Sequence, residues 1–160
     1  EWVVSKRWGM QVGLVVAVAL GVSACSGEPP DTHPDQPVTK RRAVFKEMVQ
    51  TMEPMGMVAR GRKDYQAAEF LASAVALEQL ASKPWAYFTA DSNYPPTKAK
   101  PAVWDKPGEF KEAQQAFEVQ VAALVQAAKG TDLDASKASV SQVQQSCKAC
   151  HDSFRKVEAN

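Results

Sequence analysis

The sequence predicts an all-α protein that folds as an antiparallel four-helix bundle. Four segments repeat apolar residues at the spacing of an α-helix, and no segment shows the alternation typical of a strand. Two of the three connections between these segments are short, which favours antiparallel neighbours. The chain has 160 residues, 45% of them hydrophobic, and a net charge of +1. These values suit one globular domain and argue against a nucleic-acid partner.

The first two helices are expected over about residues 39–60 and 64–81. Pro54 should kink the last turn of the first helix, Gly61 should end it, and Asp64 can cap the second. One face of the first helix carries residues spaced by four and three positions, so that they share a single stripe. These residues are Arg41, Phe45, Met48, Met52 and Met55.

A long irregular stretch is expected over about 82–107, where prolines recur too often for a long helix. Its density of aromatic residues predicts a loop that packs onto the core. The aromatic residues are Trp85, Tyr87, Phe88, Tyr94 and Trp104. The third helix is then expected over about 109–128, with Gly130 after its end, and the fourth over about 133–156.

Residues 1–24 have the pattern of a bacterial export signal. Lys6 and Arg7 precede the apolar run VGLVVAVALGV, which is too short to span a bilayer comfortably. The small residues before Cys25 resemble a lipobox, which would make Cys25 the lipidated first residue of the mature protein. The alternative is an ordinary cleaved signal with a cysteine nearby by chance.

This signal divides the chain into three parts. Residues 25–38 are expected to form the lipid anchor and a Pro-rich linker, and residues 39–160 the helical bundle. His33 has no partner ligands in the linker, so it should simply be solvated. We therefore expect export to the periplasm and contact with a membrane through the anchor only.

The segment QQSCKACHDSFRK contains Cys147, Cys150 and His151 in the pattern C-x-x-C-H. Positions i, i+3 and i+4 lie on one side of a helix, so the three side chains should project together into the bundle. Two thiols at this spacing can form thioethers with the two vinyl groups of a haem, and the adjacent imidazole can bind the iron. The pattern therefore predicts one covalently bound haem c near the carboxy-terminal helix, with His151 as its axial ligand.

Other uses of this motif each lack a component. A zinc site needs about four ligands, and beyond the motif the sequence offers only Cys25 and His33 as cysteine or histidine ligands. A thioredoxin-like dithiol belongs at a strand-to-helix junction, which the pattern does not predict. A disulfide between Cys147 and Cys150 leaves His151 unexplained. An exported chain with four expected helices thus favours haem attachment.

Four stretches of the sequence are similar to segments of one known family. CKACHDSFRK, at 147–156, resembles its haem-binding segment, and RRAVFKEMVQTMEPM, at 41–55, resembles its first helix. LASKPWAYF, at 80–88, and EFKEAQQAF, at 109–117, resemble the segment after the second helix and the start of the third. Together they resemble the cytochrome c′ family of bacterial periplasmic four-helix-bundle haem proteins, which is related to the low-spin cytochromes c-556.

The resemblance implies roles for individual residues. Phe45 takes the place of the apolar side chain that covers the far face of the iron, and a phenyl ring cannot ligate iron. Arg41 and Arg42 take the places of arginines near a haem propionate, and Arg155 that of an arginine beside the axial histidine. Met48, one turn after Phe45, is kept as an alternative axial ligand, as in the low-spin relatives.

These features predict a haem protein that is not an enzyme. It would carry electrons for an unidentified periplasmic redox partner, bind small gases such as nitric oxide and carbon monoxide at a five-coordinate high-spin haem, or both. A six-coordinate low-spin electron carrier with Met48 on the iron is the alternative. A peroxidase-like enzyme would need a distal acid–base residue, which the Phe and Met stripe does not supply. Trp85 and Phe88 are expected in packing or at the haem edge, and the family is compatible with a homodimer.

Overall fold

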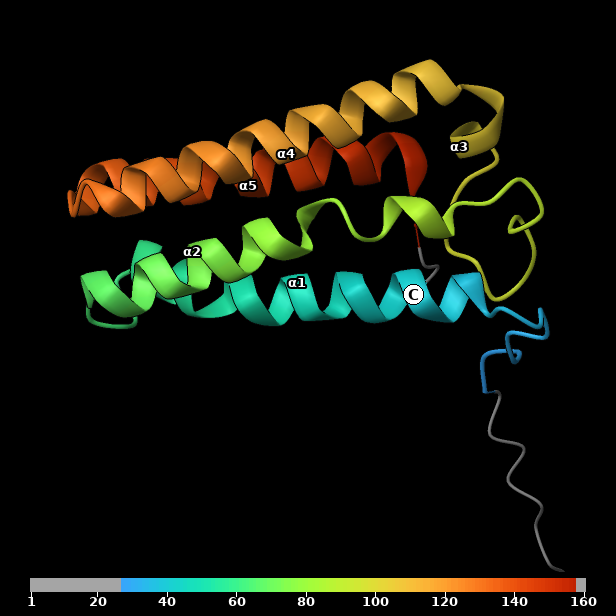
Figure 1. The fold of residues 1–160 in the computed structure, drawn as a ribbon, viewed down its shortest axis with the longest axis horizontal. Coiled ribbons are helices and arrows are strands. Elements are labelled where there is room, and N and C mark those ends of the chain that lie inside the picture. Colours follow the sequence, from blue (N-terminus) through green and yellow to red (C-terminus); the bar gives the residue numbers. More distant parts are fainter. Residues whose placement is uncertain (1–26, 158–160) are drawn as a thin grey trace, which may run out of the picture.

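The computed structural model describes residues 27–157, which fold into four long antiparallel helices (Figure 1). These helices are α1 (Pro37–Ala59), α2 (Ala67–Ala81), α4 (Pro107–Lys129) and α5 (Leu133–Phe154). α1 and α2 form one layer, and α4 and α5 form the other. α1 packs against α2, α2 against α4 and α4 against α5, whereas the seam between α1 and α5 is the least extensive of the four. The expected four-helix bundle is confirmed.

The expected signal peptide and Cys25 lie outside the described residues. Nothing in the fold therefore bears on the expected cleavage or lipidation. None of the helices within residues 27–157 combines the length and apolar character of a membrane span.

Both ends of α1 follow from local chemistry. Pro37 stands at the start of the helix, where its missing N–H would have had no partner. At the other end the N–H of Gly61 donates to Val58 O (3.0 Å) and that of Arg62 donates to Met57 O (2.8 Å). This pairing is a Schellman motif, and it needs the left-handed φ of 68° that Gly61 adopts without a steric penalty. The expected helix stop is confirmed.

The start of α2 corrects the expectation that Asp64 caps it. The helix begins at Ala67, behind an extended Gln66 whose side chain makes no capping hydrogen bond. Tyr65 packs edge-on against Phe70 with ring centroids 5.5 Å apart. This contact draws the preceding segment onto the bundle, so an apolar contact rather than a polar cap sets where the helix begins.

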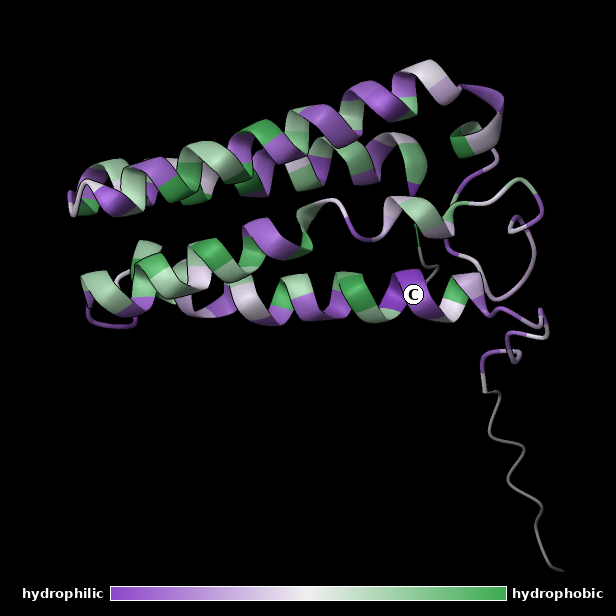
Figure 2. Ribbon diagram, in the orientation of Figure 1, coloured by the Kyte–Doolittle hydropathy of each residue, from purple (hydrophilic) through white to green (hydrophobic). Residues whose placement is uncertain are grey.

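Two clusters of buried side chains fill the space between the layers. The larger cluster draws on all four long helices and includes Leu77, Leu124 and Val140, which are 0% exposed. The smaller cluster centres on Phe110 and Phe154, whose rings lie 5.2 Å apart. Figure 2 shows apolar and polar residues side by side along each helix, as one buried face per helix requires.

The irregular stretch after α2 closes the end of the bundle where α1 begins and α5 ends (Figure 1). It contains a 3-10 turn at Trp85–Tyr87 and a short helix, α3 (Ala102–Asp105). Trp85 and Phe88 pack against the buried clusters, so the expected packed loop is confirmed.

α5 stops at Phe154, two residues before its expected end. The reason is that Arg155 leaves the helix in an extended conformation and forms an antiparallel bridge with Ala99 of this loop.

Residues 27–36, which we call the strap, are tied to the bundle, whereas a free linker was expected. Asp31 accepts a hydrogen bond from the N–H of Thr39 in the first turn of α1 (2.8 Å) and another from Tyr94 Oη in the loop (2.5 Å). His33 was expected to be solvated, but its Nε2 lies 2.9 Å from Asp91 Oδ2 and its ring stacks on Tyr94. The partners in the loop, Asp91 and Tyr94, lie about 60 residues away in the sequence, so no local pattern could reveal these contacts.

Candidate functional site

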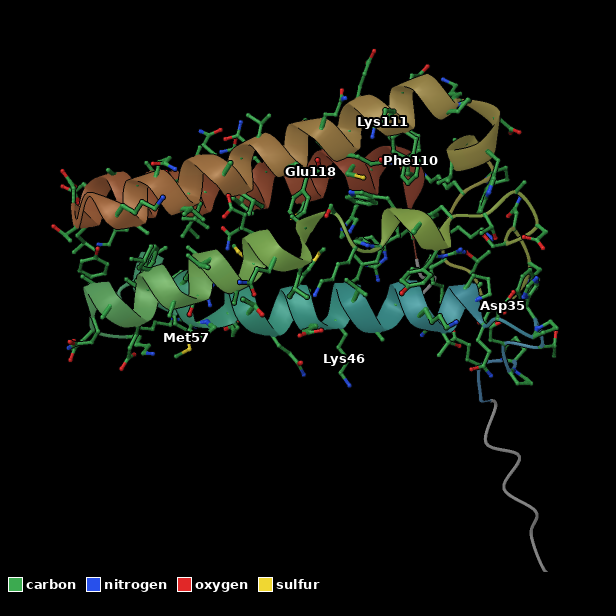
Figure 3. The ribbon with its side chains drawn as sticks, in the orientation of Figure 1. Asp35, Lys46, Met57, Phe110, Lys111 and Glu118 are labelled. Carbon is green, nitrogen blue, oxygen red and sulfur yellow. The ribbon has the colours of Figure 1, made fainter. Side chains whose placement is uncertain are left out.

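A cleft of about 780 Å³ opens between α1, α5 and the loop over 85–103. This volume lies within the range of roughly 300–1,000 Å³ that is usual for small-molecule and cofactor sites. The cleft lies along the α1–α5 seam, where the two helices have the fewest shared contacts. Phe110 lines it from α4, the neighbour of α5 in the same layer, and Figure 3 shows its ring reaching from α4 toward the space between the layers.

The three motif residues lie together in this cleft, as the sequence predicts. Cys147, Cys150 and His151 all line it from the last two turns of α5. Cys147 packs against the larger buried cluster and Cys150 against the smaller one, so the two thiols lie where the clusters meet. Both cysteines are free in the structure.

Burial keeps both thiols protonated near neutral pH. It raises the pKa of Cys147, and it raises that of Cys150 to about 11 together with the neighbouring Cys147. A thiol that attacks disulfides or holds zinc must be a thiolate, which a positive environment favours. The setting of this pair therefore speaks against a redox dithiol or a metal–thiolate site. Residues 27–157 also contain no cluster of three or more Cys, His, Asp or Glu suited to a metal ion.

His151 lines the cleft from α5, and its surroundings favour the uncharged imidazole by lowering its pKa. Burial lowers its pKa, the charge of Arg155 lowers it further, and Asp152 acts in the opposite direction. A neutral ring nitrogen is the form of histidine that ligates metals. The cleft thus combines two protonated thiols and one neutral imidazole on adjacent turns of one helix.

α1 forms the wall that faces the motif. Phe45 is half-buried and lines the cleft, and its ring packs edge-on against Trp85 and Phe88 at centroid distances of 5.9 and 6.3 Å. Met48 also lines the cleft, but it is 5% exposed and belongs to the larger buried cluster. Phe45 consequently offers the cleft more of its side-chain surface than Met48 does.

Aromatic rings continue this wall around the cleft. Phe88 packs on Phe110 at 5.0 Å, and Trp85 contacts Phe110 and Phe117 edge-on. Trp85 also donates a hydrogen bond from Nε1 to Glu118 Oε1 on α4 (2.6 Å). This bond helps to orient the half-buried indole, because its N–H is satisfied in this position. Trp85 and Phe88 thus occupy the packing positions that the sequence predicts.

Arg41 is a buried cation, 3% exposed, which points into the loop. Its Nη1 donates to Tyr87 O and Ser92 Oγ (both 2.8 Å). Its Nη2 donates to Ser92 O (3.0 Å) and Thr97 Oγ1 (2.6 Å). The guanidinium also lies 4.5 Å from the centre of the Phe88 ring. All four Nη hydrogens are therefore used within the protein, and only Nε–H is left for a propionate of the kind that the resemblance implies.

Arg42 and Arg155 both line the cleft near its opening. Arg42 pairs with Glu28 of the strap (2.7 Å), and Glu28 also pairs with Lys98 (3.4 Å). Both cations that pair with Glu28 line the cleft themselves. Arg155 lies close enough to His151 to lower its pKa. Arg155 thus lies beside the histidine, as the resemblance implies, and Arg42 lines the cleft, whereas its role beside a propionate stays a prediction.

Several cleft residues were not singled out from the sequence. Thr97, Lys98 and Ala99 belong to the Pro-rich stretch, where no period marks an inward face. Phe110 and Phe154 lie on the apolar faces of the expected helices, but periodicity does not separate a cleft residue from an ordinary core residue. The partners of Arg41 were equally hidden, because Ser92 and Thr97 are small polar residues in a loop.

The sequence matches the family model of cytochrome c′ over residues 36–155. The chain belongs to the cytochrome c′ family. It is 36% identical to the cytochrome c′ of Alcaligenes xylosoxydans xylosoxydans over 123 residues, which is 77% of this chain and 95% of that protein. It is 34% identical to the cytochrome c′ of Halomonas halodenitrificans over 128 residues, 76% of this chain and 97% of that one.

Solved cytochrome c′ structures share this fold. The nitric oxide complex of a mutant of cytochrome c′ from Alcaligenes xylosoxidans gives a TM-score of 0.75 at 34% identity, covering 79% of this chain and 98% of that one. A carbon monoxide-bound variant of the same protein gives 0.74 at 34% identity, covering 80% and 100%. The family match begins at residue 36, so the strap lies almost entirely before it.

As a cytochrome c′, the chain binds one covalently attached haem c, and the cleft fits this group. The fit rests on the donor set: two protonated thiols for the vinyl groups, one neutral imidazole for the iron, and aromatic walls for the porphyrin faces. Cys147 and Cys150 would form the thioethers and His151 would ligate the iron. Arg42 and Arg155 would stand near the charged propionate edge.

We expect Arg41→Lys to destabilise the holoprotein. A lysine keeps the charge, but its single ammonium cannot reach the acceptors that the planar guanidinium joins. With buried acceptors left unpaired at about 1–3 kcal/mol each, the free energy of unfolding should fall by about 2–4 kcal/mol in urea titrations. Arg42→Lys is the matched control, and its exposed position should limit the change to about 0.5 kcal/mol. An equal fall in the free energy of unfolding in the two variants would show that the buried hydrogen bonds of Arg41 do not stabilise the fold more than an exposed arginine does.

We expect Cys147→Ala combined with Cys150→Ala to abolish covalent haem attachment. Pigment should then be removed by acid–acetone extraction, whereas each single variant should keep one thioether and retain its pigment. The loss of bound haem should also lower the thermal midpoint, because a group that binds only the folded state stabilises it. Pigment that resists extraction from the double variant would refute the assignment of these two cysteines.

Proposed function

We propose that this cytochrome c′ is a periplasmic, non-enzymatic haem protein that binds small gases such as nitric oxide and carbon monoxide, transfers electrons, or does both. In this proposal His151 is the one protein ligand of a five-coordinate, high-spin iron. The observation that carries it is the position of Phe45, whose half-buried ring faces the cleft from α1, opposite the helix that bears His151. Phenylalanine has no atom that ligates iron, so it leaves the second axial position to an external ligand.

Solved relatives support the gas-binding part of this proposal. Two of them are described as nitric oxide and carbon monoxide complexes of cytochrome c′ from Alcaligenes xylosoxidans. In the present chain the wall opposite His151 is built from Phe45, Trp85 and Phe88. The indole N–H of Trp85 is its one polar donor, and that N–H already donates to Glu118, so it is not available to a bound gas. Such a wall favours neutral diatomic molecules that need no such donor. A ligand must displace the packed ring of Phe45, so its binding should be slow.

The alternative is a low-spin electron carrier in which Met48 ligates the iron. Met48 lines the cleft one turn after Phe45, and a thioether is a good haem ligand. Its burial in the larger cluster speaks against this role, because the side chain already contributes to the core. A peroxidase-like activity is less well supported, because Phe45 and Met48 occupy the helical stripe where an acid–base group would be needed.

Periplasmic location and a lipid anchor complete the proposal, and both rest on the sequence before the strap. The charged start, the apolar run and the small residues before Cys25 support export with lipidation of that cysteine. Cysteine lipidation supplies several acyl chains, which makes anchoring stable rather than marginal.

We expect Phe45→Ala to speed carbon monoxide binding to the ferrous protein, as measured by stopped-flow absorbance. The truncation opens the wall and removes the ring that a ligand must displace. Because the ring is half-buried, the loss of stability should be smaller than the roughly 3–5 kcal/mol of a fully buried one. Met48→Leu is the matched variant, and as a volume-conserving change it should cost less than about 1.5 kcal/mol and leave the spin state unchanged. A low-spin ferric spectrum with a far-red sulfur-to-iron band that disappears in Met48→Leu would instead establish the Met48 ligand.

We expect the native protein to partition into the detergent phase and Cys25→Ser to partition into the aqueous phase. The reason is that the acyl chains would be attached at Cys25 and nowhere else. Both proteins should keep the same haem spectrum, since the change lies outside the family-matched residues. An intact mass equal to that of an unmodified chain would contradict lipidation.

A further inference from the structure

The strap joins the amino-terminal end of the described chain to the opening of the haem cleft. Glu28 pairs with Arg42 at 2.7 Å and with Lys98 at 3.4 Å, and both of these cations line the cleft. The segment before α1 therefore starts beside the cleft and does not swing freely from the first turn of α1. Figure 1 shows the strap, in blue, at the end of the bundle where α1 begins.

Several contacts along the strap act together to hold it. Asp31 bonds both to the first turn of α1 and to Tyr94 of the loop, and His33 bonds to Asp91 and stacks on Tyr94. Val38, just after the strap, is 0% exposed and fixes its far end. A single exposed ion pair would contribute only about 0–1 kcal/mol. The strap is thus held at Glu28, Asp31 and His33, and the buried Val38 fixes the chain where the strap joins α1.

The hydrogen bond between Asp31 and Tyr94 persists over a wide pH range. Burial acts to raise the pKa of Asp31, but hydrogen bonds from Tyr94 and Thr39 lower it to about 2. Burial and the neighbouring Asp31 raise the pKa of Tyr94 to about 12. Stability from the Asp31 carboxylate is lost only as the pH falls below its unfolded value of about 3.9 toward 2. Stability from the neutral Tyr94 is lost only as the pH rises above about 10 toward 12. This hydrogen bond between the strap and the loop is therefore present at physiological pH.

The distance from the strap to the expected anchor is short. Three peptide units separate Cys25 from Glu28, and an extended chain spans at most about 3.6 Å for each, or about 11 Å in all. The opposite end of the bundle, with the α1–α2 and α4–α5 turns, lies one helix length away (Figure 1). With the 23 residues of α4, that length is about 35 Å.

We propose that the strap holds the haem-cleft end of the lipid-anchored bundle against the membrane surface, so that this end and not the α1–α2 turn is the one closer to the bilayer. This inference rests on the lipid anchor of the proposed function. A tether of at most about 11 Å that starts at the cleft opening keeps that end of the bundle beside the bilayer while the strap stays bound, so a bundle about 35 Å long cannot rest on its far end alone. A redox partner or a gas then reaches the cleft from the membrane side.

The test compares two fluorescent labels on the lipidated holoprotein in phosphatidylcholine vesicles. Asn93→Cys places a label on the exposed loop beside the strap, and Arg62→Cys places one at the exposed α1–α2 turn. The introduced thiol is the only free one, because the three native cysteines are acylated or bound to haem in this proposal. The readout is the ratio of fluorescence with and without nitroxide on the lipid headgroups, so that quenching by haem cancels.

We expect severalfold stronger nitroxide quenching at position 93 than at position 62. Glu28→Gln, Asp31→Asn and His33→Gln combined should bring the two values together, because they release the strap outside the family-matched bundle. Glu69→Gln with Glu109→Gln is the matched control. It removes two exposed, ion-paired carboxylates elsewhere and should preserve the difference. Circular dichroism and the haem spectrum check that each variant is folded.

Two kinds of result would overturn the orientation while leaving the anchor intact. One is vesicle-bound protein with equal quenching at both positions, or stronger quenching at position 62. The other is a difference between the positions that survives release of the strap, which would assign the orientation to another surface. Protein that stays in the supernatant would refute the lipid anchor itself, and the orientation with it, so the two failures are distinguishable.

Discussion

The buried guanidinium of Arg41 is the interaction on which the rest of this cytochrome c′ depends. A charge taken out of water is costly unless its donors find partners, and here the loop provides four acceptors for the Nη hydrogens and an aromatic face. The loop has little regular structure of its own, so its shape follows from these bonds. That shape places Trp85 and Phe88 beside Phe45, and these rings form the wall opposite the motif.

The seam between α1 and α5 sets the position of the cleft. Three pairs of long helices pack closely, whereas α1 and α5 pack less closely against each other. Their side chains surround a cleft and do not fill the space between the two helices. α5 contributes the attachment chemistry and α1 the opposing apolar wall. Because each wall belongs to a different helix, a change in packing at the seam alters the haem environment without touching the C-x-x-C-H motif. The packing of α1 against α5 therefore affects both the stability of the bundle and the surroundings of the haem iron.

The sequence predicts the parts of this protein that depend on local periodicity. The spacing of Cys147, Cys150 and His151 places them on one helical side, and the stripe from Phe45 to Met55 places the opposing wall. Contacts between distant segments leave no such signal. The bonds from Arg41 to Ser92 and Thr97, and those from Asp31 to Tyr94, join residues more than 50 positions apart. They follow from how the loop crosses the end of the bundle, and so the strap looked like a free linker.

The protonated state of the two cysteine thiols has a consequence for their reactivity. Thiol–disulfide exchange proceeds through the thiolate, and burial in the folded bundle suppresses that form at Cys147 and Cys150. Thiol–disulfide exchange at these two sulfur atoms should therefore be slower in the folded chain than in an unfolded one. The apolar surroundings that suit a porphyrin and the low reactivity of the thiols have the same origin, which is the partial burial of the end of α5.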